Sequence, residues 1–234
     1  MLLYHMREKL KTFLASLLFP KFCFGCQKEG NYLCQDCKSI LDVLNFHQLF
    51  KTEEIDDLYF STGYKNPLLK DLIKKFKYQP FIKELSLPLS SLIIDHFQLL
   101  DNPPLFYKEN LDFILIPIPL EKRRLKWRGF NQAQELAKHL SEFLDIPLVC
   151  DVLIKKQKTL PQVKLSDKER RKNISGSFSC KNQEKILKKK ILLIDDIYTT
   201  GSTMKESAKV LKNSGVKKII GIVIARAIPG QDRI

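Results

Sequence analysis

One segment near the carboxyl terminus restricts the fold more than any other: Ile191–Thr203, with the sequence ILLIDDIYTTGST. An apolar run is followed by two acids, and then by a turn of small hydroxyl residues around one glycine. An apolar run without alternation suits a strand that is buried on both faces, as in a parallel sheet covered by helices. The segment therefore predicts a strand, a loop and the start of a helix in an α/β fold.

Further apolar and amphipathic segments repeat this order along the chain. The expected strands are Asp57–Lys65, Phe113–Ile118, Pro147–Leu153 and Lys217–Ala225. The expected helices are Pro67–Tyr78, about 81–100, Asn131–Leu144 and Ser202–Asn213, with a loop at Asp101–Pro104. Strands alternating with helices predict a mainly parallel sheet with helices on both faces, which we assign to one domain, residues 46–234.

The acids and the small-residue turn predict a ligand site at the edge of this sheet. Ligands bind where parallel strands end, because the loops there open onto helix amino termini. The turn offers backbone N–H groups, hydroxyls and a helix dipole to a phosphate. The paired acids repel a phosphate, so they suit ribose hydroxyls or Mg²⁺ held through water; a helix-capping role would explain one acid but not two. The candidate residues are Asp195, Asp196, Thr199, Thr200, Gly201, Ser202 and Thr203.

The charge balance favours an anionic partner. Forty Lys and Arg against 26 Asp and Glu give a net charge of +14, and residues 121–172 hold 14 of the cations but only 7 of the acids. Within this window the loop Pro119–Gln132 follows a predicted strand, at the same sheet edge as the acids. Its candidate residues for pyrophosphate or nucleic acid are Arg123, Arg124, Lys126, Trp127 and Arg128.

Two interpretations of this loop stay open. Guanidinium groups pair with phosphate oxygens, and Trp127 and Phe130 between the cations suit stacking on bases of a single strand. Alternatively, Trp127 is a buried core residue and the arginines are solvated. The polar segment Lys155–Lys172 lacks periodicity, and loops of this length are usually functional or disordered.

Four of the six cysteines form two closely spaced pairs, Cys23 with Cys26 and Cys34 with Cys37. Four thiolates in this arrangement are what a closed tetrahedral Zn²⁺ site requires, and such a site is structural; a redox dithiol is the alternative. The pattern favours a reducing cytosol. We assign residues 1–45 to a small module made of a helix that ends at Pro20 and this cysteine site. We expect Cys150 to be a buried core residue, and the four histidines form no motif.

The apolar run in the first 22 residues is too short to span a bilayer and has no convincing signal cleavage site. Two roles remain for this basic, amphipathic segment: a helix packed on its own domain, or a helix on a membrane surface. We expect a cytoplasmic protein, with a peripheral position at the inner membrane left open.

Several motifs together resemble a known family. The run, acids and turn of ILLIDDIYTTGST resemble the phosphoribosyl pyrophosphate signature of type I phosphoribosyltransferases. The whole chain resembles the ComF (ComFC) competence family. The motifs that carry this resemblance are LLFPKFCFGC, CQDC, GYKNPLLKDLIKKFKY, IPIPLEKRRLKWRGFNQAQELA, QVKLSDKERRKNISGSF, LLIDDIYTTGST and IVIARA.

This resemblance implies a phosphoribosyltransferase-like domain behind a zinc-binding module, in a protein of DNA uptake during natural transformation. It implies phosphoribosyl pyrophosphate with Mg²⁺ as the ligand and structural Zn²⁺ at the cysteines. It also places the polar segment where phosphoribosyltransferases have a flexible loop that closes over the substrate. The matching polar residues there are Gln162, Arg170, Arg171 and Asn173.

Two hypotheses about function remain. In the first, the protein binds single-stranded DNA near the inner-membrane proteins of DNA uptake, and keeps a phosphoribosyl ligand site. In the second, it is an enzyme that transfers phosphoribose to an unidentified acceptor with release of pyrophosphate. A third, that the cysteine module only docks other proteins, is weaker. The sequence reveals no acceptor pocket that would decide between them.

Overall fold

The computed structural model of the protein describes residues 20–108, 112–156, 174 and 176–227. The chain forms two compact units, residues 1–41 and 42–234. Two of the sequence predictions lie outside the described residues: the helix before Pro20, and the loop with Gln162, Arg170, Arg171 and Asn173. In the part of the chain that is described, no helix has the length and apolar character to cross a membrane.

The smaller unit is a compact cysteine-bearing turn followed by the short helix α2 (Gln35–Ser39). Phe22 and Glu29 form an antiparallel bridge, and the N–H of Cys23 donates to the carbonyl of Lys28 at 2.9 Å. These contacts fold the first cysteine pair into a tight turn. The second pair is placed by α2, because Cys34 is its N-cap and Cys37 lies in its first turn.

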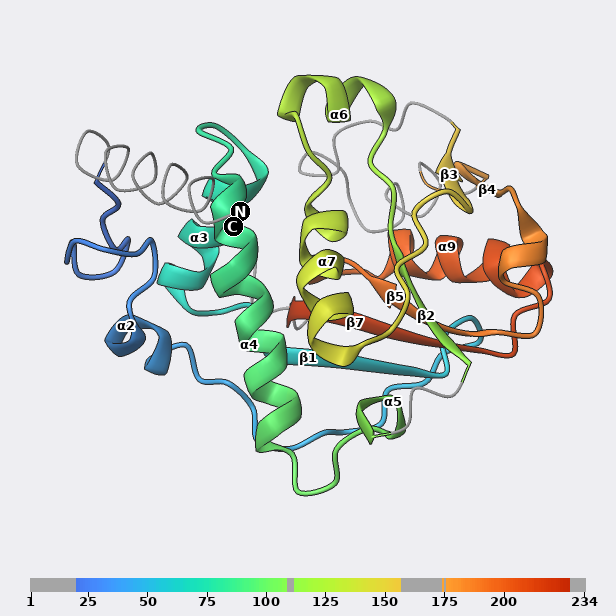
Figure 1. Ribbon diagram of the computed structural model, residues 1–234, viewed down its shortest axis with the longest axis horizontal. Helices are drawn as coiled ribbons and strands as arrows, with labels where there is room; N and C mark the ends of the chain where they lie inside the picture. The colour runs from blue at the N-terminus through green and yellow to red at the C-terminus, as the bar shows by residue number, and fades with distance from the viewer. Residues whose placement is uncertain (1–19, 109–111, 157–173, 175, 228–234) are drawn as a thin grey trace, which may run out of the picture. The chain divides into compact units, whose positions relative to one another are not determined.

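The larger unit is built on a sheet with the strand order β1-β7-β5-β2, and with the short strand β6 beside β7 (Figure 1). The strands are β1 (Asp57–Gly63), β2 (Phe113–Pro117), β5 (Lys190–Ile194), β6 (Ile197–Tyr198) and β7 (Lys218–Arg226). Every pairing in it is parallel, so the carboxyl ends of all these strands lie at one edge. This confirms the predicted mainly parallel sheet.

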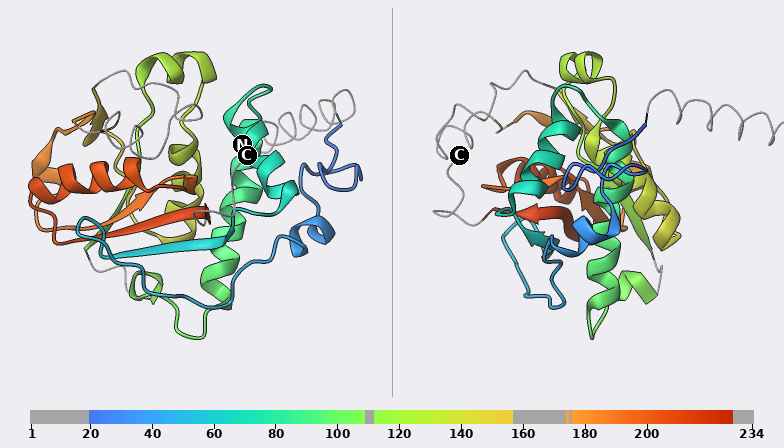
Figure 2. Two further views of the ribbon diagram at one scale, coloured as in Figure 1. Left: turned by 180° about the vertical axis from the view of Figure 1, so that it is seen from behind. Right: turned by 90° about the vertical axis from the view of Figure 1, so that its left-hand side faces the viewer.

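Helices cover both faces of this sheet. The described helices of this unit are α3 (Pro67–Lys77), α4 (Ser86–Leu99), α5 (Leu105–Lys108), α6 (Lys122–Arg128), α7 (Gln132–Leu144) and α9 (Ser202–Asn213), with 3-10 turns at Lys83–Leu85 and Gln183–Lys185. Among them α6 has no buried residue. The helices α4 and α7 pack on each other and lie in front of the sheet in Figure 1, whereas α9 is in front in the left view of Figure 2. The strands are buried because a helical layer lies on each side.

A glycine in the middle of β7 allows α9 to approach the sheet closely. A Cβ atom at Gly221 would lie 2.5 Å from the sulfur of Met204 and 2.8 Å from Cδ1 of Leu58. Distances this short are excluded, so any side chain here would force the Met204 and Leu58 side chains to move. This packing holds the amino end of α9, and the loop before it, next to the end of β5.

Two strand and core predictions between α7 and β4 are wrong. Within the segment Pro147–Leu153 only Leu148 bridges β2, opposite Leu115. The N–H of Leu115 donates to the carbonyl of Pro147 at 2.8 Å, and the N–H of Val149 donates to the carbonyl of Leu115 at 2.9 Å. The chain then leaves the sheet and forms β3 (Leu153–Lys155), which pairs antiparallel with β4 (Phe178–Cys180). Cys150, which we expected in the core, is exposed in this segment.

The helices also differ from prediction in two places: α4 begins later, and the basic loop contains an additional helix. Phe81 has a φ of 56°, a left-handed conformation that a helix cannot contain, so α4 begins only at Ser86. The basic loop contains a helix, α6, which the sequence analysis did not expect. Gly129 ends α6 with a φ of 85° and donates its N–H to the carbonyl of Leu125, which is a common way to terminate a helix.

Candidate functional site

The two adjacent acids lie directly after β5, at the carboxyl edge of the sheet. Asp196 is buried, and Asp195 is partly buried beside it. Oδ1 of Asp195 accepts the N–H of Asp196 at 2.9 Å, and Oδ1 of Asp196 accepts the N–H of Ile197 at 2.7 Å. Each carboxylate is therefore oriented by one oxygen, while its Oδ2 accepts no hydrogen bond from the described residues.

A lysine that the sequence analysis missed forms an ion pair with this acid pair. Nζ of Lys77, the last residue of α3, lies 2.9 Å from Oδ1 of Asp196. The two side chains are 24% and 9% exposed, so water screens the pair only in part. A signal for Lys77 existed in the sequence: it follows Leu69 and Ile73 at four-residue steps, on the apolar face of α3.

The charges at this edge affect one another. Burial and the Asp196 carboxylate raise the pKa of Asp195 to about 7, against the opposing effects of Lys77 and Lys155. Burial alone would discharge Lys77, but the Asp196 carboxylate outweighs it and raises the pKa of that lysine. Lys77 is therefore positively charged at neutral pH, whereas the Asp195 carboxyl gains or loses its proton near neutral pH.

The turn that follows the acids joins β6 to α9. Gly201 is the N-cap of α9, with a φ of 73°, and a Cβ atom there would lie 2.1 Å from the hydroxyl of Tyr198. Only glycine fits this position. The hydroxyls of Thr200 and Ser202 are 2.8 Å apart and the N–H of Ser202 points to Oγ1 of Thr200 at 3.4 Å, so the turn is pre-ordered. Thr199 before it is exposed, and Thr203 lies in the first turn of α9.

The predicted basic loop divides into exposed residues and one residue directed at the acids. Arg123 and Lys126 of α6 are exposed, and Arg124 lies 3.9 Å from Glu121. Arg128 is half-buried: burial lowers its pKa, while the Asp196 carboxylate raises it. Its Nε is buried without a hydrogen-bond partner in the described part of the chain. The fold thus brings Arg128 to the acids and leaves the other cations at the surface.

The aromatic residues of this loop have different environments. Trp127 is 58% exposed and touches Phe81 edge to face, with ring centroids 4.7 Å apart, so the interpretation as a core tryptophan is wrong. Phe130 is buried against Phe76 with ring centroids at 5.5 Å, so it is not exposed for stacking on a base. Trp127 is therefore the aromatic residue of α6 that is exposed for stacking.

Buried amides join the loop to the sheet and to α3. Nδ2 of Asn131 donates to the carbonyl of Ile118 at 3.0 Å, and Nε2 of Gln132 donates to the carbonyl of Phe76 at 3.2 Å. Phe76 precedes Lys77 in α3. The same contacts thus fix the ends of β2 and α3 relative to α7, and they position Lys77 at the acids.

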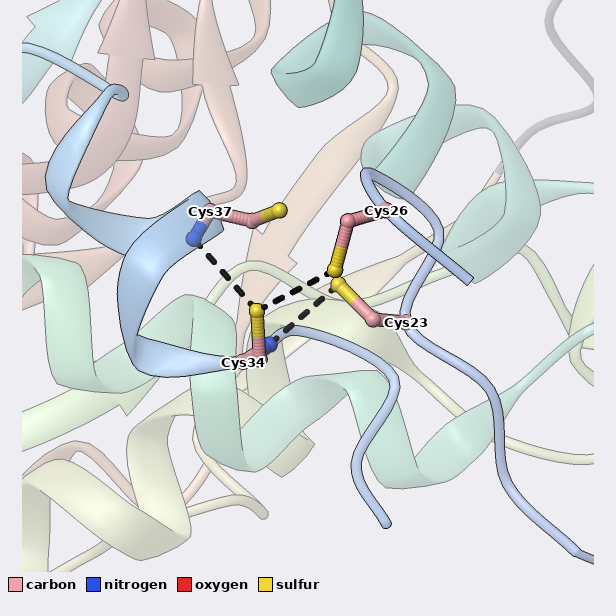
Figure 3. A group of neighbouring side chains, drawn as sticks. All are labelled: Cys23, Cys26, Cys34 and Cys37. Atoms are coloured by element: carbon pink, nitrogen blue, oxygen red, sulfur yellow. Dashed lines mark hydrogen bonds between the residues drawn. The ribbon is translucent and has the colours of Figure 1, made fainter. Parts of the chain in front are cut away.

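The four cysteines of the smaller unit meet at one point (Figure 3). Their sulfur atoms all lie within 4.8 Å of one another, and those of Cys26 and Cys34 are 3.6 Å apart. Backbone N–H groups point at two of the sulfurs, Cys34 N–H at Cys23 and Cys37 N–H at Cys34. Four sulfurs around one metal ion at about 2.3 Å have separations of this size, so the cluster fits a tetrahedral metal such as Zn²⁺.

The protonation of the thiols supports a cation between them. Burial disfavours the Cys23 thiolate, but N–H groups of Cys34, Cys26 and Gly25 outweigh it and lower the pKa of Cys23 to about 6. Burial and the neighbouring sulfurs raise the pKa of Cys37. Burial and the neighbouring sulfurs disfavour a second thiolate beside Cys23, and a bound metal ion would supply the positive charge that stabilises it.

Comparisons with known proteins agree with these features. Residues 126–234 match the phosphoribosyl transferase domain family. The chain is 32% identical to Competence protein F of Haemophilus influenzae over 210 residues, which cover 88% of this chain and 90% of that protein. It is 30% identical to Competence protein ComFC of Bacillus subtilis, with 83% and 79% covered. The DNA utilization protein YhgH of Escherichia coli O157:H7 is 31% identical over 45% of each chain. The chain therefore belongs to the family of competence proteins F and ComFC, with a phosphoribosyltransferase-like domain behind a four-cysteine cluster.

Proposed function

We propose that this protein is a cytoplasmic factor of DNA uptake that binds single-stranded DNA on α6 and a phosphoribosyl ligand, such as phosphoribosyl pyrophosphate, at the end of β5. The observation that carries the proposal is the ion pair between Lys77 and Asp196 beside the pre-ordered turn at Gly201. Anion-binding groups and groups that accept hydroxyl hydrogens lie within one site, and a phosphorylated sugar needs both.

Each part of the ligand has a matching group. The turn Thr199–Thr203 and the amino end of α9 suit the 5′-phosphate. The unused Oδ2 atoms of Asp195 and Asp196 suit the ribose hydroxyls. Lys77 and Arg128 suit the pyrophosphate, since both cations are held close to the acids. Mg²⁺, when bound with the ligand, would neutralise phosphate charge and be held by the same two carboxylates through water.

The surface of α6 is suited to binding single-stranded DNA. Exposed cations neutralise phosphates, and an exposed aromatic ring stacks on bases without regard to sequence. Lys122, Arg123 and Lys126 are exposed on this helix together with Trp127. In uptake, such a surface would hold the incoming strand at the inner face of the membrane, beside the inner-membrane proteins that deliver it.

Replacing Trp127 with alanine is expected to weaken binding of a thymine 12-mer by about fivefold or more, with little change in its salt dependence. Replacing Arg123 with alanine should instead make the logarithm of affinity fall less steeply with the logarithm of salt, by about one unit of slope. Fluorescence anisotropy at several salt concentrations measures both. The controls are Phe143→Ala at the far end of α7, and Lys218→Ala at the amino end of β7. If the control substitutions weaken binding equally, the proposal that α6 binds single-stranded DNA is contradicted.

One observation favours the enzymatic alternative. A general acid or base works best when its pKa is near the working pH, and that of Asp195 is about 7. In this alternative the protein transfers phosphoribose to an acceptor, and the nucleophile replaces pyrophosphate at the anomeric carbon. Calorimetric titration with phosphoribosyl pyrophosphate and Mg²⁺, followed by a pyrophosphate assay, separates the two functions. Pyrophosphate release that is lost in Asp195→Asn, with water or an added nucleophile as the acceptor, would support the enzyme. Ligand binding without release, beside salt-dependent binding of single-stranded DNA, would favour the first function.

We propose Zn²⁺ as the metal of the cysteine cluster. Protein purified without chelators should contain about one zinc ion per chain, and Cys26→Ser should lower this content because three thiolates hold the ion less tightly. Inductively coupled plasma mass spectrometry measures the content. Cys150→Ser is the matched control, since Cys150 lies outside the cluster and is exposed. Zinc-free wild-type protein, or equal zinc in both variants, would contradict the assignment.

A further inference from the structure

A second cavity, of about 250 Å³, lies in the larger unit at the edge strand β1. This cavity is not part of the candidate site at the end of β5. The residues that line this cavity include Phe46, His47, Phe60, Gly63, His96 and Arg226. They come from the segment before β1, from the strands β1 and β7, and from α4.

The segment before β1 forms one wall. It runs along the outer edge of the sheet, because the N–H of Leu44 donates to the carbonyl of Ser61 at 2.9 Å. Nε2 of His47 lies 3.0 Å from Oδ2 of Asp57, and the His47 ring stacks on Tyr59 with centroids 3.9 Å apart. These contacts give the wall a fixed shape. Phe46, between them, is 58% exposed and presents an aromatic ring at the cavity.

His96 supplies a buried acceptor that lacks a donor. Its Nδ1 lies 2.7 Å from the carbonyl oxygen of Leu44. A carbonyl oxygen only accepts, so Nδ1 carries the proton and Nε2 of the neutral ring carries a lone pair. Burial lowers the pKa of His96, which favours this neutral ring. The residue is 1% exposed, and Nε2 has no hydrogen-bond partner within the described ranges.

Arg226 supplies donors on the same cavity. Its guanidinium lies over the ring of Phe50 at 4.1 Å and near the ring of Phe60 at 5.6 Å. No described carboxylate forms an ion pair with it. A guanidinium that lies over aromatic rings can still donate its N–H groups to an oxygen of a ligand.

The cavity has room for a ring but not for a large ligand. Pockets that bind drug-sized molecules have volumes of about 300 Å³ or more, and the volume of this cavity is slightly smaller. A Cβ atom at Gly63 would meet nothing within 4 Å, so the backbone of β1 is open to the ligand there. Aromatic walls, the acceptor of His96, the donors of Arg226 and the amide of Gln48 fit a planar heterocycle.

We propose that this cavity binds a nucleobase with a neighbouring N–H and carbonyl oxygen, such as thymine or guanine, through His96 and Arg226. Nε2 of His96 is buried in the free protein, so the base reaches it with a small movement of the cavity wall. The N–H of the base then donates to Nε2 of His96, and the carbonyl oxygen accepts from the guanidinium of Arg226. Adenine has no carbonyl oxygen and is disfavoured. The base belongs either to a strand, in which case this inference rests on the proposed strand binding, or to a free nucleoside.

The first arm of the test uses strands. Abasic 12-mers that carry three thymines or three adenines are titrated by fluorescence anisotropy into the full chain. Wild type is expected to prefer the thymine strand by about fivefold, since a bound base contributes on this scale and stacking at Trp127 tolerates any base. Gly63→Leu should abolish the preference by filling the cavity. Gly63→Ala, which adds one methyl group, should retain most of it.

The variants are chosen to fold. Gly63 lacks a positive φ and has open space around its Cβ position, so leucine causes no backbone strain there. His96→Phe keeps an aromatic ring but removes both the acceptor Nε2 and the Nδ1–H that donates to the carbonyl of Leu44, and should also abolish the preference. Melting temperatures within about 3 °C of wild type will show that loss of the preference is not loss of the fold. A preference that persists in Gly63→Leu would overturn the inference.

The second arm uses free thymidine and adenosine, followed through the NMR signals of the His96 ring. Shifts caused by thymidine alone, and absent in Gly63→Leu, would show that free nucleosides reach the cavity. If no DNA strand binds at any salt concentration, the proposed binding of single-stranded DNA is refuted. The nucleoside titration then tests the cavity by itself. Without thymidine shifts and without a thymine preference, the nucleobase assignment is wrong even if strands bind.

Discussion

Replacing Lys77 with methionine is expected to lower the free energy of unfolding by about 2–4 kcal/mol at pH 8, and by less at pH 5. The ammonium of Lys77 is the nearest cation to Asp196, at 2.9 Å, and its side chain is only 24% exposed. Methionine has a similar volume, so the loss reports the missing charge rather than a cavity. Urea denaturation at the two pH values measures the difference.

The pH dependence follows from Asp195. Its pKa of about 7 lies above the unfolded value of about 4, although Lys77 lowers it. A carboxyl with a raised folded pKa binds protons more tightly in the folded state, so stability falls as pH rises between the two values. Without Lys77 the pKa rises further, and the loss of stability at pH 8 grows.

Two further variants make the Lys77 prediction specific. Lys75→Met, on the same helix, breaks a more exposed ion pair with Asp71 and should cost no more than about 0.5 kcal/mol. Lys77→Met combined with Asp196→Asn should recover most of the stability, because position 196 then carries no buried charge that has lost its partner. An equal loss in both lysine variants, or no recovery in the double variant, would contradict the ion pair as a stabilising contact.

Replacing Asp195 with asparagine is expected to weaken binding of phosphoribosyl pyrophosphate by about 100-fold and to stabilise the protein at pH 8. The binding loss corresponds to about 3 kcal/mol, the scale of hydrogen bonds from ribose hydroxyls to a charged acceptor. The stabilisation arises because burial and Asp196 disfavour the charge that asparagine lacks. Calorimetry measures the first effect, and thermal unfolding measures the second.

Stability and binding should thus change in opposite directions in this variant. The melting temperature should rise by about 2–6 °C at pH 8 and by little at pH 4, where the wild-type carboxyl already holds its proton. Asp71→Asn, an exposed acid of α3, is the control and should change neither quantity much. Asp195→Asn with lower stability at pH 8, or with unchanged ligand affinity, would remove Asp195 from the proposed site.

The sheet and the main site loop could be predicted because their signals are local. The apolar runs of β2, β5 and β7 are buried on both faces, and Gly201 stands where only glycine fits. The prediction for Pro147–Leu153 was wrong because an apolar run does not say whether a neighbouring strand extends far enough to pair with it. The helix α6 was missed because it is short and presents no buried face.

Local sequence patterns were enough to identify the main strands of the sheet, the two acids after β5 and the two closely spaced cysteine pairs, since each depends on residues close together in the chain. Long-range packing brings Lys77 to Asp196, directs Arg128 rather than Arg123 at the acids, and places His96 in a cavity with Arg226. These contacts join residues far apart in the sequence. They form only when helices pack on the sheet and exclude water, which is what makes a charge or an unused acceptor consequential.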